Sequence, residues 1–71
     1  MSDKVFIYGK DGWPYTDKAR SDFGNKAVYY NVKADKSRMD EMLGYSKGDR
    51  KVPVIVNGDN VQVGYGGFWG V

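Results

Sequence analysis

Apolar positions along the chain follow two different spacings, and their alternation predicts alternating strands and helices. Residues 4–8 (KVFIY) are an almost continuous apolar run, which is the pattern of a buried strand. After a short glycine-containing loop, Pro14 suits the first turn of a helix, because its missing N–H is no loss there. Tyr15, Ala19 and Phe23 then recur every fourth residue, so we expect them on one helical face.

The middle of the chain repeats this order of strand and helix. Residues 27–32 alternate between the two faces of a second strand. Residues 35–48 predict a second helix, whose buried stripe holds two methionines and a leucine. Two residues are candidates for its N-cap: Ser37, as part of a capping box, or Asp35.

The last part of the chain predicts a hairpin and then a glycine-rich aromatic tail. Residues 52–56 (VPVIV) and 61–64 (VQVG) predict two strands, joined by the turn sequence NGDN. The tail, residues 65–71 (YGGFWGV), is too short and too rich in glycine to predict a helix. The order β-α-β-α-β-β, without linker or repeat, predicts one α/β domain over residues 1–71, with helices covering a four-stranded sheet.

Composition removes several classes of function. The chain has no cysteine and no histidine, so it can form no disulfide and no thiolate, and it lacks the usual ligands of zinc, haem and iron–sulfur sites. We therefore expect no bound metal. A net charge of +2, with scattered charges, predicts no nucleic-acid partner. No apolar run approaches the ~20 residues of a membrane helix. The default expectation is a soluble, cytoplasmic monomer.

Several residues fall into a known pattern once these elements are placed. The stretch VFIYGKDGWPYT resembles the first strand and active-site turn of a glutaredoxin, which usually runs Tyr-Ser-Lys-x-x-Cys-Pro-Tyr-Cys. Tyr8, Lys10, Pro14 and Tyr15 match that motif in place. The resemblance covers almost the whole chain and implies a small thioredoxin-like fold, with a mixed sheet and a C-terminal helix that is shortened or absent.

The second half of the chain carries the rest of the resemblance. Val52 and Pro53 occupy the positions of the family's Val-Pro, whose peptide bond is cis, before the third strand. Gly66 and Gly67 resemble the Gly-Gly that follows the hairpin. The resemblance implies that glutathione, or a peptide or protein disulfide, is the partner. In that interpretation Val52 pairs with the glutathione backbone, and the two glycines admit its γ-glutamyl end.

The active-site turn departs from the family at its two reactive positions. Trp13 stands at the position of the nucleophile and Thr16 at that of the resolving cysteine, so Cys-Pro-Tyr-Cys becomes Trp-Pro-Tyr-Thr. Around them the resemblance implies that Lys10 and Tyr15 border the glutathione groove. Thr16 could donate a hydrogen bond to a chalcogenolate at position 13. An indole forms no mixed disulfide, so this chain should not catalyse thiol–disulfide exchange.

Three interpretations of Trp13 remain open at this point. It can replace a selenocysteine or cysteine, because UGG differs by one base from UGA and from both cysteine codons. It can be native, as part of a redox-inactive module that binds a peptide, glutathione or a protein. It can be a packing residue only. Likewise, Lys10 can be a solvated loop charge, Pro53 a trans residue at a strand start, and the Gly66–Gly67 pair a simple turn.

Overall fold

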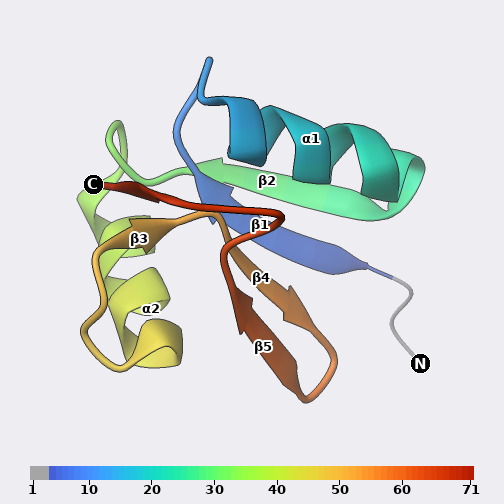
Figure 1. Ribbon diagram of the computed structural model, residues 1–71. Coiled ribbons are helices and arrows are strands. Elements are labelled where there is room, and N and C mark those ends of the chain that lie inside the picture. Colours follow the sequence, from blue (N-terminus) through green and yellow to red (C-terminus); the bar gives the residue numbers. More distant parts are fainter. Residues whose placement is uncertain (1–3) are drawn as a thin grey trace.

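The computed structural model describes residues 4–71, which form a small α/β fold with a four-stranded mixed sheet and two α-helices (Figure 1). The elements follow in the order β1 (Val5–Gly9), α1 (Pro14–Phe23), the 3₁₀ turn η1 (Gly24–Lys26), β2 (Ala27–Asn31), α2 (Lys36–Ser46), β3 (Lys51–Val52), β4 (Val54–Asn57), β5 (Asn60–Val63) and β6 (Trp69–Gly70). This architecture is broadly compatible with a thioredoxin-like fold.

The main sheet has the strand order β2-β1-β4-β5. Strands β1 and β2 are parallel, and α1 forms the crossover that a parallel pair requires. The pairs β1–β4 and β4–β5 are antiparallel, and the second is the hairpin predicted around NGDN. A separate two-stranded sheet pairs β3 with β6.

Side chains that alternate along the strands build one apolar cluster on each face of the sheet. On one face, Tyr8, Val54 and Val56 pack with Met39 and Met42 of α2. The cluster on the other face joins side chains of β1 and β4 to α1, through Val5, Ile7, Ala19 and Ile55. Because neighbouring residues of a strand point to opposite faces, β1 and β4 contribute to both clusters. The two helices therefore cover opposite faces of the sheet (Figure 1).

Two predicted details are corrected by the structure, and one alternative that the sequence left open is resolved. The strand expected over residues 52–56 is divided into β3 and β4, because Pro53 lies between them and has no N–H to continue a ladder. The side chain of Asp35, not Ser37, caps α2, and it accepts hydrogen bonds from the backbone N–H groups of Ser37 and Arg38. The buried residues of α1 are Thr16 and Ala19, whereas Tyr15 is half-buried.

The C-terminal tail contains a strand where the resemblance implied a shortened or absent helix. Residues Trp69–Gly70 form β6, which runs antiparallel to β3. In Figure 1 this red segment lies beside β3, although the two strands are far apart in the sequence. None of the helices within residues 4–71 has the length and apolar character needed to cross a bilayer.

Candidate functional site

Trp13, which the resemblance places at the nucleophile position, lies at the N-terminus of α1. Trp13 is the N-cap residue, with extended backbone (φ −88°, ψ 130°), and its side chain makes no capping hydrogen bond. Pro14 occupies the first turn, and the N–H of Asp17 donates to the carbonyl of Trp13 at 2.9 Å. Residue 13 therefore stands at the positive end of a ten-residue helix, where a negative charge would be stabilised.

The ring of Trp13 joins the start of α1 to the segment around Pro53. It is half-buried and packs against the apolar cluster that includes Val52. Its centroid lies 5.2 Å from that of Trp69, in a tilted arrangement. Trp69 is also the β6 partner of Val52, and the Val52–Pro53 bond is cis. Trp13, Val52 and Trp69 thus form one contiguous group of residues from three elements.

Tyr15 and Gly67 make the closest contact of this group. The Tyr15 ring lies 6.5 Å from the Trp69 ring, edge to face. A Cβ at position 67 would lie 2.6 Å from Cε1 and 2.8 Å from Cε2 of Tyr15, and closer still to Cζ. Only a residue without a side chain fits beneath this ring. Gly67 is therefore explained by packing against Tyr15, while Gly66 has φ +74° and open space around its Cα.

Thr16 is brought near the site but is not exposed in it. It is fully buried, and a Cβ at Gly9 would lie 2.5 Å from its Cγ2 and 2.6 Å from its Oγ1. Among the residues that the structure describes, its hydroxyl has no hydrogen-bond partner. The side chain at the predicted resolving position thus lies against the backbone of β1.

Lys10 contributes its backbone to the turn before α1. Its carbonyl accepts a hydrogen bond from the Trp13 N–H at 3.3 Å. Its Nζ lies 3.5 Å from the carbonyl oxygen of Asp11, and the side chain is partly exposed. The structure therefore places Lys10 in the same loop as Trp13, with its ammonium group directed to the neighbouring backbone.

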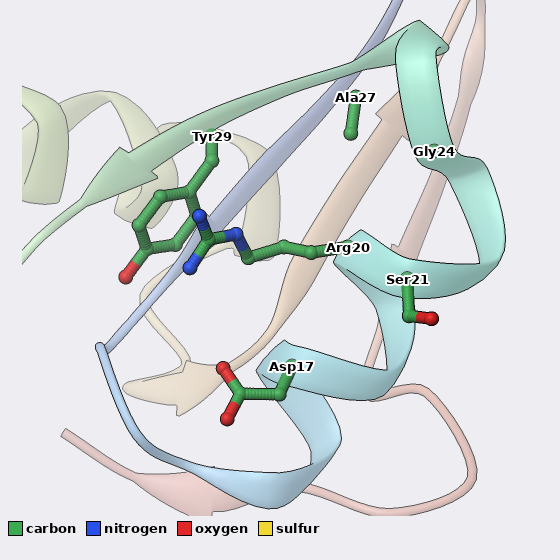
Figure 2. A pocket seen from close by; sticks show the side chains of 6 residues that line it. All are labelled: Asp17, Arg20, Ser21, Gly24, Ala27 and Tyr29. Carbon is green, nitrogen blue, oxygen red and sulfur yellow. The ribbon is translucent and has the colours of Figure 1, made fainter.

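Two cavities lie outside this group of residues. One of about 370 Å³ opens between α1 and β2, where the Arg20 guanidinium lies 4.0 Å from the centre of the Tyr29 ring (Figure 2). The other, of about 280 Å³, lies beside α2 and contains Lys33 and Arg50. Neither is lined by a residue that the sequence predicted for the site, and both are open and polar. We therefore place the candidate site at the start of α1.

The largest pKa shifts belong to two tyrosines of the sheet, Tyr8 and Tyr29. Burial and a hydrogen bond to Glu41 raise the pKa of Tyr8 well above its usual value. Burial and a hydrogen bond to Asp11 raise the pKa of Tyr29 in the same way, and that bond lowers the pKa of Asp11. Tyr8 matches the family motif in the sequence, and the structure places it in the core, where its ring packs against Tyr30.

Sequence reasoning missed Trp69 as a member of the site. The sequence left residues 65–71 as a glycine-rich tail without a predicted element, whereas the structure places the Trp69 ring on both Trp13 and Tyr15. The signal that could have found it is the glycine-flanked aromatic pair itself, because isolated aromatic residues in a flexible tail need a surface to pack against.

Comparison of the chain with protein-family models, with curated proteins and with solved structures finds no match. Within residues 4–71, no cluster of acidic side chains has the arrangement of a metal site. The resemblance to glutaredoxins therefore rests on the sequence motifs quoted above.

Proposed function

We propose that position 13 is the nucleophile position of a glutathione-linked oxidoreductase of the glutaredoxin type, and that Trp13 makes this chain redox-inactive. One observation carries the proposal: residue 13 is the N-cap of α1 and packs against the cluster that contains Val52. A thiolate at this position would face the positive end of the helix, which lowers thiol pKa values. Val52 would offer backbone groups to an extended ligand beside it.

The chemistry requires one sulfur or selenium atom at position 13. A thiolate there attacks the glutathionyl sulfur of a mixed disulfide, the S–S bond breaks, and the other partner leaves as a thiolate. Free glutathione then attacks the new mixed disulfide, which releases oxidised glutathione and restores the thiolate. Because free glutathione is the resolving thiol in the second step, a buried Thr16 at the second position is compatible with the cycle.

In this proposal the remaining residues of the group bind and orient glutathione. Tyr15 packs on Gly67 and lies edge to face against Trp69, so its ring lies beside the start of α1, where it would contact the ligand. Lys10 adds a positive charge in the same loop, which favours the anionic ends of glutathione. No metal takes part in this mechanism.

The proposal is tested by Trp13→Cys in the full chain. We expect this variant to catalyse the glutathione-dependent reduction of a small glutathionyl mixed disulfide, while the wild-type chain does not. Ser21→Cys is the matched control, because Ser21 is exposed on α1 away from its N-terminus. Activity in both variants would show only the reactivity of an exposed thiol. A folded Trp13→Cys variant without activity would contradict the proposal.

A second candidate function is a redox-inactive binding module for a peptide, glutathione or a protein. It is favoured by the aromatic group at the start of α1, where the rings of Trp13 and Tyr15 both contact Trp69, which is 45% exposed. Such flat, partly exposed rings supply contact area at low entropic cost. Amide shifts of Lys10, Val52 and Gly66 on adding glutathione would support the glutathione groove. Shifts confined to the tail would favour a different partner.

A further inference from the structure

The edge of β3 is already occupied by the C-terminal end of the same chain. We call residues 68–71 the strap. Val52 pairs with Trp69 and Lys51 with Gly70 in an antiparallel ladder. The ladder is extended by a hydrogen bond of 2.9 Å from the N–H of Val71 to the carbonyl of Arg50. The Arg50 Nε donates in return to the Val71 carbonyl, also at 2.9 Å.

The strap uses the same backbone groups that an extended ligand would need. A peptide that adds to a strand edge gains its affinity from main-chain hydrogen bonds. In this chain the hydrogen-bonding edge of Lys51 and Val52 faces Trp69 and Gly70. The Trp69 ring also covers Trp13, the residue at the proposed nucleophile position. A ligand and the strap therefore cannot occupy the edge together.

The strap is short and partly exposed, and Val71 is its one residue that packs against the apolar cluster containing Val52. Its strand is two residues long, and its large side chains, Phe68 and Trp69, are 49% and 45% exposed. Beyond the ladder, Trp69 rests on aromatic rings, and the Lys51 ammonium group lies 4.6 Å from the centre of the Phe68 ring. The segment before it contains Gly64 and Gly66, both with positive φ, where few other residues could replace them. Short, exposed elements of this kind open at low cost in free energy.

We propose that the strap is an autoinhibitory self-ligand, which must leave β3 before glutathione can pair with Val52. This inference rests on the proposed function, because it takes the Val52 edge to be the ligand site. When only a fraction of molecules has an open edge, the apparent Kd rises by the inverse of that fraction. The strap thus sets the affinity of the site, and its release makes residue 13 accessible.

The test is a titration of the full chain with S-methylglutathione, which has no free thiol, followed by amide chemical shifts. Trp69→Ala weakens the strap. We expect this variant to bind S-methylglutathione about two- to tenfold more tightly than the wild type, because it loses an aromatic contact that holds the strap closed. Tyr45→Ala is the matched control, because Tyr45 is 45% exposed, as is Trp69, but lies on α2. Its Kd should equal that of the wild type.

Hydrogen exchange of the Val71 amide gives an independent reading in the wild-type chain. This N–H is bonded to Arg50, so its protection reports a closed strap, and saturating S-methylglutathione should remove that protection. If Trp69→Ala binds with the wild-type Kd, or if the Val71 amide stays protected when the ligand is bound, the strap is not autoinhibitory. Either result leaves the proposed function intact. Absence of binding in both the wild type and Trp69→Ala would overturn the proposed function and the strap with it.

Discussion

Replacing Thr16 by valine tests whether the hydroxyl at the predicted resolving position is buried without a hydrogen-bond partner. Thr16 is fully buried, and its hydroxyl has no hydrogen-bond partner among the described residues. An unpaired buried hydroxyl costs about 1–3 kcal/mol of folding free energy. Valine has nearly the same shape and a similar helix propensity, so it keeps the contact with Gly9 and removes the unpaired group.

We therefore expect Thr16→Val to raise the free energy of unfolding by about 1–2 kcal/mol, the lower part of that range. For a domain of this size, the midpoint of thermal unfolding should rise by about 4–8 °C for each kcal/mol. Urea unfolding, followed by tryptophan fluorescence, measures the change directly, and the slope of free energy against urea should stay the same. Thr16→Ser is the control. It keeps the hydroxyl, loses a buried methyl group, and should destabilise by about 1 kcal/mol.

The result that refutes this reasoning is a Thr16→Val variant that is less stable than the wild type with an unchanged urea slope. In that case the hydroxyl has a hydrogen-bond partner in the folded protein, and it carries no cost of an unpaired buried group. Binding of S-methylglutathione should not change in Thr16→Val, because the side chain is fully buried against β1.

Two further predictions concern the tail and the sheet. Gly67→Ala should lower the free energy of unfolding, measured in urea, by about 1–3 kcal/mol, because its Cβ would overlap the Tyr15 ring. The control Gly44→Ala, which has open space in a helix, should raise it by about 0.5–1 kcal/mol. Equal effects of the two substitutions would contradict the contact between Gly67 and Tyr15. The raised pKa of folded Tyr29, caused by burial and Asp11, means that stability is complete below the unfolded pKa of about 10 and falls as pH rises above it. Tyr29→Phe should reduce this alkaline loss in urea titrations from pH 8 to 11, and an unchanged slope would contradict it.

Local patterns were sufficient to predict the main elements. The apolar runs predicted β1, β2 and the β4–β5 hairpin, and the helical spacing predicted α1 and α2. These signals succeed because each element buries a face whose period is visible within a few residues. The N-cap of α2 was left open between Ser37 and Asp35, since both residue types can cap, and only the backbone geometry distinguishes them.

Features that depend on distant parts of the chain could not be predicted in this way. The strap pairs with residues about twenty positions earlier, and no local period indicates that these two segments pair. The buried face of α1 differs from the predicted face for a similar reason. Tyr15 follows the helical spacing of Ala19 and Phe23, but its ring packs on Gly67. Thr16 is buried in its place, because Gly9 leaves room for it. The position of Trp13 at the start of α1 was predicted, and its contact with Trp69 was not.

The most direct test of the account is the pKa of the thiol in Trp13→Cys, measured from thiolate absorbance or from the pH dependence of alkylation. Position 13 lies at the positive end of α1, with Lys10 in the same loop, so we expect a pKa clearly below the value of about 8.5 for a free cysteine. The thiol in Ser21→Cys should titrate near that ordinary value. A thiol at position 13 with a pKa at or above about 8.5 would contradict the claim that this is a nucleophile position.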